Sequence, residues 1–284
     1  MKAVLNLFKV RIGTAIALAA AAGLAIEAGS SKVSFLQKTI LVAAVLVASA
    51  AAGAFNQYVE RDIDVRMART RNRPFVTGTL KHGPFWLWVI GAMIVASFLS
   101  VFFFTNLVAA VHVFLGAFTY GVVYTVWLKR RTWWNIVVGG LAGSFAVLAG
   151  AAAVSPSPGA AAIALAVVLF LWTPPHFWSL AIACREDYAA AGVPMLPVVV
   201  GDARAAHAIH ASTGLLVATS VAPFFFGLGW IYLAAALAGG AWFLLKTVRL
   251  MKRPGRPAAR AAFLASLVQL TAVLVGAMVD VAVS

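Results

Sequence analysis

The sequence predicts an all-α polytopic membrane protein, a bundle of nine transmembrane helices around a central cavity. Of the 284 residues, 63% are hydrophobic and only 11% are charged, whereas soluble globular proteins have about 25% charged residues. The mean hydropathy is +0.96. Long apolar stretches leave no room for a sizeable soluble domain, so residues 1–284 are expected to form a single transmembrane domain.

Nine apolar stretches are each long enough to cross a bilayer, which takes about 20 residues of helix. They are residues 12–29, 35–58, 84–104, 107–128, 134–154, 160–183, 206–228, 230–248 and 260–282. Proline and glycine clusters at 155–159 and 253–257 mark turns, and another turn is expected near 227–229. A cleaved signal peptide is the alternative for the first 29 residues, but its removal would leave the bundle one helix short.

The distribution of basic residues predicts the orientation of the bundle. Lys and Arg number 22 against 8 Asp and Glu, a formal net charge of +14. If the N-terminus is cytoplasmic, all basic residues except Lys32 and Lys38 fall on the cytoplasmic side, as topology signals require. The C-terminus is then outside. Topology accounts for the positive charge, so nucleic acid is not an expected partner, and a lone cysteine, Cys184, excludes an intrachain disulfide.

The acidic residues gather on the same side, although topology does not require it. Asn56, Glu60 and Asp64 end the second stretch at a spacing of four residues, which places them on one helix face. Their oxygen atoms suit a hard cation such as Mg²⁺, with Mn²⁺ also possible. The alternative is a solvated helix end with surface ion pairs. At a helix end these acids are expected to be exposed, so neutralising them should leave the bundle folded.

Basic side chains surround this stripe in the sequence. Arg69 and Arg73 follow it directly, and guanidinium groups beside a metal suit a diphosphate. Lys129 and Arg130 follow the fourth stretch and suit the same anion, with a pure topology role as the alternative.

A second acidic segment, containing Asp187, follows the sixth stretch. The second and sixth stretches end on the same side of the membrane, so both acidic segments are expected to flank one cleft and could hold two metal ions. His176, after Pro174 and Pro175, is a candidate ligand contact, with a packed helix histidine as the alternative. His207 and His210, three residues apart on one helix face, are expected to belong to a polar helix end, with a two-histidine metal site as the alternative.

The stripe resembles the N-x-x-x-D-x-x-x-D signature of the intramembrane aromatic prenyltransferases, the 4-hydroxybenzoate polyprenyltransferase superfamily. Longer strings resemble one branch, the haem O synthase (protoheme IX farnesyltransferase) family, and the resemblance extends to about Gly201. These strings are residues 56–74, 124–132, 172–182 and 187–199. Two departures stand out: Glu60 replaces the usual Asp, and Asp187 has no acid four residues away.

The resemblance implies farnesyl transfer from farnesyl diphosphate to a vinyl group of haem B, with addition of water, giving haem O and diphosphate. It implies that Asn56, Glu60, Asp64 and Asp187 hold Mg²⁺ and act in catalysis, and that His176 binds haem. Arg69, Arg73, Lys129 and Arg130 match the diphosphate-binding positions. Aromatic faces can stabilise an allylic cation, with lipid-facing or core packing as the alternative role. The candidates at a suitable depth are Phe55, Tyr58, Tyr120, Tyr124, Trp172, Phe177 and Trp178.

The same resemblance implies an integral protein of the cytoplasmic membrane with its active-site loops in the cytoplasm. Candidate protein partners are a haem A synthase or terminal oxidase assembly factors. The closest alternative is a prenyltransferase acting on a quinone-precursor ring. A transporter would need ionisable groups within the spans, and a haem-handling module without catalysis would leave the stripe of Asn56, Glu60 and Asp64 unexplained.

Overall fold

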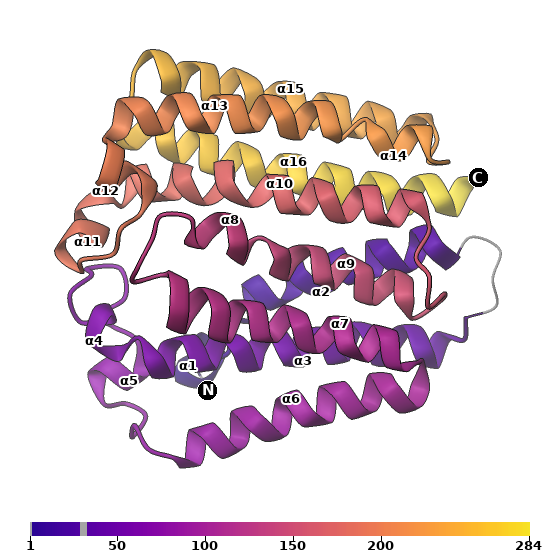
Figure 1. The fold of residues 1–284 in the computed structure, drawn as a ribbon, viewed down its shortest axis with the longest axis horizontal. Helices are drawn as coiled ribbons and strands as arrows, with labels where there is room; N and C mark the ends of the chain where they lie inside the picture. Colours follow the sequence, from indigo (N-terminus) through magenta and orange to yellow (C-terminus); the bar gives the residue numbers. More distant parts are fainter. Residues whose placement is uncertain (1, 29–32) are drawn as a thin grey trace.

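The computed structural model describes residues 2–28 and 33–284, and every regular element in this part of the chain is a helix (Figure 1). Six of the predicted spans are single helices: α2 (Val10–Ala28), α3 (Phe35–Val59), α6 (Phe85–Phe104), α10 (Ala160–Ala183), α15 (Trp230–Lys252) and α16 (Arg256–Val283). Three spans are built from two consecutive pieces: α7 (Leu107–Phe118) with η1 (Thr119–Leu128), α8 (Asn135–Gly139) with α9 (Leu141–Ala152), and α13 (Asp202–Thr219) with α14 (Ala222–Phe225).

Five short helices lie together at one end of the bundle, on the left of Figure 1. They are α1 (Lys2–Leu7), α4 (Arg61–Asp64), α5 (Pro74–Thr77), α11 (Arg185–Ala190) and α12 (Leu196–Val200). The C-terminus lies at the opposite end. An odd number of spans between the two ends produces this arrangement.

The described residues contain nine helices that are long and apolar enough to span a membrane, as the sequence predicts. Three boundaries were placed too far inside the apolar core. The seventh span begins at Asp202 instead of 206, the eighth ends at Lys252 instead of 248, and the ninth begins at Arg256 instead of 260. Helical hydrogen bonding continues into the charged segments, where hydropathy has already fallen. Residue 29 and Lys32 lie outside the described residues.

The spans pack as a closed arrangement in which the first contacts the last. Helix α2 packs against α3, α9 and α16, while α10 joins the two halves by contacting α9, α13 and α16. Since α2 lies within these contacts, it is an integral part of the bundle and not an appended segment.

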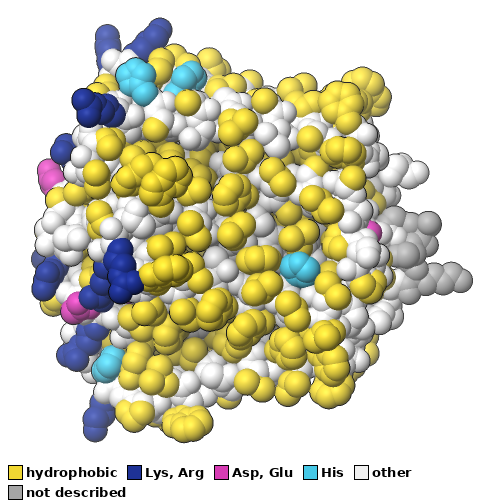
Figure 2. All heavy atoms as spheres, in the orientation of Figure 1, with side chains coloured by type: hydrophobic (Ala, Val, Ile, Leu, Met, Phe, Trp, Pro, Cys, Tyr) yellow, Lys and Arg dark blue, Asp and Glu magenta, His cyan; other side chains and the backbone are white. Residues whose placement is uncertain are grey.

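Large hydrophobic side chains cover the outside of the bundle between its two ends (Figure 2). Lys and Arg concentrate at the end that carries the short helices. Aromatic residues such as Phe103 and Trp230 are 74% exposed, which would be unfavourable in water and is expected in lipid. The chain is therefore an integral membrane protein.

The two acids at the other end cap helices. Glu27 accepts a hydrogen bond from the N–H of Gly159, which precedes α10, at 2.8 Å. Asp280 accepts from the N–H groups of Gly229, Ile231 and Tyr232 at the start of α15. Each carboxylate satisfies donors that a helix N-terminus leaves free.

Helices α2 and α9 cross so closely that only glycine fits at the contact. A Cβ at Gly150 would overlap the carbonyl oxygen of Ala20, and one at Gly23 would overlap that of Val147. Gly91 on α6, by contrast, has no neighbouring atom within 4 Å of such a Cβ.

Gly150→Ala should therefore destabilise the protein by about 1–3 kcal/mol, because backbone must move to make room. The matched substitution Gly91→Ala should be neutral or stabilise by up to about 1 kcal/mol, since it only raises helix propensity. Thermal unfolding of both variants in detergent measures the difference. Equal midpoints would contradict the close crossing.

Candidate active site

Asn56, Glu60 and Asp64 lie on one helix face, as their spacing predicts. Glu60 lies at the junction of α3 and α4, where its N–H donates to the carbonyl of Asn56 at 3.0 Å. The N–H of Asp64 in turn donates to the carbonyl of Glu60 at 2.8 Å. The helical register thus continues through the junction and keeps the three side chains on one face.

The expectation that these acids are exposed is wrong. Glu60 is 1% exposed and Asp64 is 0% exposed. The loop that follows turns back on Asp64, whose carbonyl accepts from the Thr70 hydroxyl at 3.0 Å and whose carboxylate binds Arg73. Buried carboxylates need partners. Removing one partner of a buried pair therefore destabilises the fold more than removing one partner of a surface pair.

Two cations supply the partners. The Nζ of Lys129 contacts both carboxylate oxygens of Glu60, at 2.5 and 2.6 Å. Nη1 of Arg73 contacts both oxygens of Asp64, at 2.8 and 2.6 Å, and lies 4.0 Å from Glu60. Arg73 therefore bridges the two acids. Burial raises the pKa of Asp64, and the Arg73 guanidinium opposes that rise. For Lys129, burial lowers the pKa, and the carboxylate of Glu60 opposes that fall.

A third cation, Lys9, completes the cluster from the N-terminal segment. Its Nζ donates to Oδ1 of Asn56 at 2.5 Å and to the hydroxyl of Tyr120 at 3.1 Å. Burial, and then repulsion by Arg73, lowers the pKa of Lys9 to about 7. Sequence reasoning missed this residue. Its only signal is its position at the membrane edge, and every basic residue that sets the topology lies at such an edge.

The fourth span presents its polar side chains through a π-helix, which sequence reasoning did not foresee. In η1 the hydroxyl of Thr125 donates to the carbonyl of Tyr120 at 2.8 Å, and the backbone N–H of Lys129 donates to the carbonyl of Tyr124 at 2.9 Å. Both bonds reach back five residues. The rings of Tyr120 and Tyr124 stack at 5.6 Å, and each lies 5.7 Å from a lysine Nζ of the cluster. Such helices are frequent at functional sites.

The two acidic segments meet, as predicted, at the same end of the bundle. Asp187 accepts a hydrogen bond from the N–H of Ala68 at 2.9 Å. The guanidinium of Arg69 lies 4.6 Å above the ring of Tyr188. These contacts join the loop that follows the stripe to α11.

The structure separates the two basic residues that follow η1. Lys129 points to the buried cluster, whereas Arg130 binds Asp62 through two contacts of 2.8 and 2.7 Å. The side chains of this outer pair are 41% and 57% exposed. Consecutive helical positions point about 100° apart, so only one of the two can face inward.

His176 lies inside α10 and packs against α16. Nδ1 lies 2.6 Å from the hydroxyl of Ser266, and the ring stacks on Trp172 and Phe263 at 4.0 and 4.5 Å. The residue is 6% exposed. This environment resembles that of a packed helix histidine. Ser266 contacts the ring through Nδ1, so Nε2 is the other ring nitrogen. His207 and His210 bond instead to Ala203 and Thr247.

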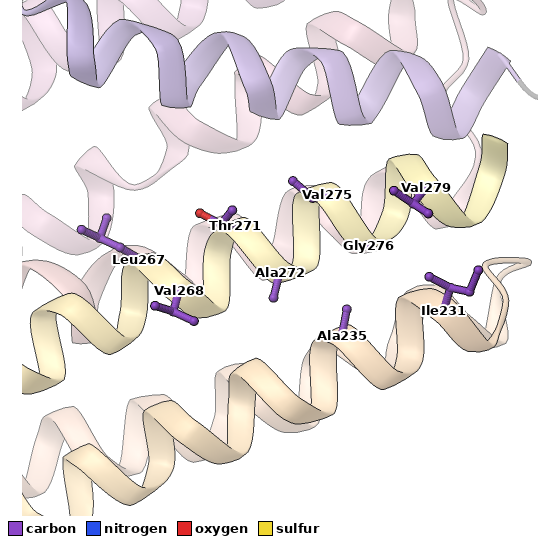
Figure 3. Close-up of a pocket in the computed structure, with 9 residues that line it drawn as sticks. All are labelled: Ile231, Ala235, Leu267, Val268, Thr271, Ala272, Val275, Gly276 and Val279. Atoms are coloured by element: carbon purple, nitrogen blue, oxygen red, sulfur yellow. The ribbon is translucent and has the colours of Figure 1, made fainter. Parts of the chain in front are cut away.

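Two hollows lie outside the cluster. One, of about 640 Å³, is an apolar groove between α15 and α16, where Ala235, Ala272 and Gly276 leave space between larger side chains (Figure 3). The other, of about 470 Å³, is lined by Tyr58 and His82 beside the Asp62 carboxylate. Neither includes the stripe.

The donor set of the stripe fits a magnesium ion that also binds a diphosphate. Among the described residues, no group of three or more His, Cys, Asp or Glu could hold a metal ion by itself. Asn56, Glu60 and Asp64 offer two carboxylates and an amide oxygen. Mg²⁺ sites in proteins usually combine one or two carboxylates with substrate phosphates and water, so such a site needs no third acid.

A model of the UbiA prenyltransferase family matches residues 15–270. The chain belongs to this family. Protoheme IX farnesyltransferase 2 of Paramagnetospirillum magneticum is 55% identical over 99% of this chain and 97% of its own length. Protoheme IX farnesyltransferase of Gloeobacter violaceus is 43% identical over 82% of this chain and 77% of its own length.

Solved structures of the family share the fold. A digeranylgeranylglyceryl phosphate synthase matches with a TM-score of 0.79 at 17% identity, over 99% of this chain and 98% of its own. A UbiA homologue from Archaeoglobus fulgidus bound to DMAPP and Mg²⁺ matches with a TM-score of 0.76 at 16% identity, over 95% and 98%. The nine-span bundle is thus the UbiA membrane fold.

Glu60→Gln should destabilise the protein by about 3–5 kcal/mol, because Lys129 is left buried without a carboxylate. The double variant Glu60→Gln/Lys129→Met should recover most of this loss, since it removes both charges of the pair. Thermal unfolding in detergent tests the recovery. If the double variant unfolds at the temperature of the single one, the two side chains are not coupled.

Proposed function

We propose that this chain is a protoheme IX farnesyltransferase that converts haem B to haem O. The observation that carries the proposal is the 55% identity with Protoheme IX farnesyltransferase 2 of Paramagnetospirillum magneticum, which spans almost the whole of both chains. The site supports the same function, because buried oxygen ligands and cations are concentrated where a diphosphate and its metal can bind at the membrane end. Residues 1–284 act as one transmembrane prenyltransferase domain.

In the proposed reaction the bond between farnesyl C1 and the diphosphate oxygen breaks, and the allylic cation adds to a haem vinyl group. Water then supplies the hydroxyl and loses a proton. Asn56, Glu60 and Asp64 would hold Mg²⁺, which would supply positive charge to the leaving diphosphate. Arg73 and Lys129 are placed to donate to diphosphate oxygens from the same cluster. The faces of Tyr120 and Tyr124 can stabilise the cation, and the surrounding apolar bundle excludes bulk water.

The residues around this centre have supporting roles in the proposal. Arg69 is a further donor to the diphosphate, and Arg130 assists from the rim when it leaves Asp62. Asp187 contributes to a second metal site or holds the loop of Ala68 in place, as its present hydrogen bond does. His176 contacts haem through its free Nε2.

The orientation proposed for the bundle follows the basic residues. The end that carries the short helices and most Lys and Arg faces the cytoplasm, and the C-terminus faces outward. Haem O would leave the site into the bilayer, where a haem A synthase or a terminal oxidase assembly factor could receive it.

Purified protein with haem B, farnesyl diphosphate and Mg²⁺ should yield haem O, detected by mass spectrometry. Excess chelator should abolish the reaction, and Mg²⁺ or Mn²⁺ should restore it, because the stripe offers only hard oxygen ligands. Replacing haem B with 4-hydroxybenzoate tests the other acceptor class. Full activity in chelator, or farnesylation of 4-hydroxybenzoate alone, would contradict the proposal.

His176→Ala should weaken haem binding at least several-fold and leave the affinity for a farnesyl diphosphate analogue nearly unchanged, since the stripe and its cations are untouched. Ser266→Ala is the matched control, because it removes the Nδ1 partner and keeps the ring. Absorbance titration measures haem and calorimetry measures the analogue. If only the unfolding temperature falls, His176 is a packing residue and has no part in haem binding.

A further inference from the structure

Lys9 is distinguished from the other cations of the cluster by its partners. Arg73 and Lys129 each bind a carboxylate, whereas Nζ of Lys9 binds the neutral Asn56 amide and the Tyr120 hydroxyl. Within residues 2–28 and 33–284, no carboxylate lies within ion-pair distance of Lys9. A cation in this setting is poorly compensated.

The backbone around Lys9 is built to place the side chain there. Lys9 has φ of +45°, a value that non-glycine residues seldom adopt and that costs free energy. Gln57 fixes the preceding turn, because its Nε2 donates to the carbonyls of Asn6 at 2.8 Å and Leu7 at 3.2 Å. A Cβ at Gly53 would lie 3.3 Å from Cδ of Lys9, so the glycine makes room for the lysine stem.

The contact with Asn56 has a defined orientation. Nδ2 of Asn56 donates to the Thr125 hydroxyl at 3.1 Å, and that hydroxyl donates to the carbonyl of Tyr120. The amide therefore turns Oδ1 toward Lys9. This is the Asn56 atom that a divalent cation would use, so the ammonium and the metal compete for one oxygen.

The charge balance of the cluster favours an incoming anion. Among the described residues that make it up, three basic side chains, Lys9, Arg73 and Lys129, contact or lie beside two carboxylates, Glu60 and Asp64. A metal ion would raise the positive charge further. A diphosphate would offset it, and Lys9 is the cation that gives up no carboxylate contact when it turns to the anion.

We propose that Lys9 is a diphosphate-binding residue that rests on Asn56 until substrate arrives. In the free protein its ammonium occupies Oδ1 of Asn56. When a divalent cation takes that oxygen, the ammonium turns to the diphosphate and becomes one of its donors. The inference rests on the proposed function and deepens it by assigning the N-terminal segment to the substrate site.

The test uses two probes of the purified full chain, neither of which needs haem. Mn²⁺ alone, followed by electron paramagnetic resonance, reports the metal site. Inorganic diphosphate at saturating Mg²⁺, followed by calorimetry, reports the anion site. Lys9→Met should tighten Mn²⁺ binding about 10-fold by removing a competitor, and weaken diphosphate about 10- to 100-fold by removing a charged donor.

Three control variants separate this role from a structural one. Arg11→Met removes an exposed charge two residues away, so both affinities should change less than about 2-fold. Lys9→Arg keeps the charge and should retain most of the diphosphate affinity. Gly53→Ala presses on the lysine stem without altering any charge, and it should shift both affinities in the directions of Lys9→Met by smaller factors.

The opposite signs of the two effects decide the outcome. Unchanged diphosphate affinity in Lys9→Met, or weakening of both probes together, would overturn the inference even if the wild type converts haem B normally. If the opposite shifts appear but haem B is not farnesylated, Lys9 keeps its role and the proposed acceptor is wrong. A wild type that binds neither probe overturns both.

Discussion

Two carboxylates buried at the end of a membrane bundle are the constraint on which the rest of the site depends. Glu60 and Asp64 cannot remain ionised there without cations close by, and each cation comes from a different part of the chain. Arg73 follows the stripe, Lys129 ends the π-helix, and the neighbouring amide of Asn56 holds Lys9. The folds of the loop and the fourth span are therefore tied to these two charges, and the N-terminal segment is tied to the amide of Asn56 on the same helix face.

The same arrangement explains how the proposed site for a divalent cation and a diphosphate could remain folded before either binds. In the free protein the basic side chains neutralise the acids, so the cluster is stable as a folded unit. In the proposed function, Asn56, Glu60 and Asp64 would hold the metal ion, and Arg73 and Lys129 would then be available to the phosphate charge that accompanies it. Binding would then exchange the partners of Glu60 and Asp64 inside one cluster without leaving either carboxylate unpaired, which matters in a region of low dielectric constant.

The sequence was sufficient for the bundle and for the position of the site. Hydropathy located all nine spans, because lipid imposes length and composition on each helix separately. The spacing of Asn56, Glu60 and Asp64 located the stripe, because helical register is local. Burial of the stripe, the π-helix and the pairing of Lys9 with Asn56 could not be read in this way. The pairings of Lys9 with Asn56 and of Lys129 with Glu60 join residues that are 47 and 69 positions apart. A lysine that sets topology looks identical in sequence to one that enters a site.

The acidic residues show how position decides what a carboxylate does in this protein. Among the described residues, Asp280 and Glu27, at one end, accept hydrogen bonds from backbone N–H groups and cap helices. Asp62, at the other end, faces outward and forms an exposed pair with Arg130, which contributes little to stability. Asp64 is two residues further along, and the turn of α4 carries it inward to Arg73, where its charge must always be matched. Because the charge of Asp64 must be paired, a ligand that bound Arg73 or Asp64 would require the other side chain to find a new partner. Asp62 and Asp64 thus differ by two positions in the sequence, yet one forms an exposed pair at the surface and the other a buried pair in the cluster.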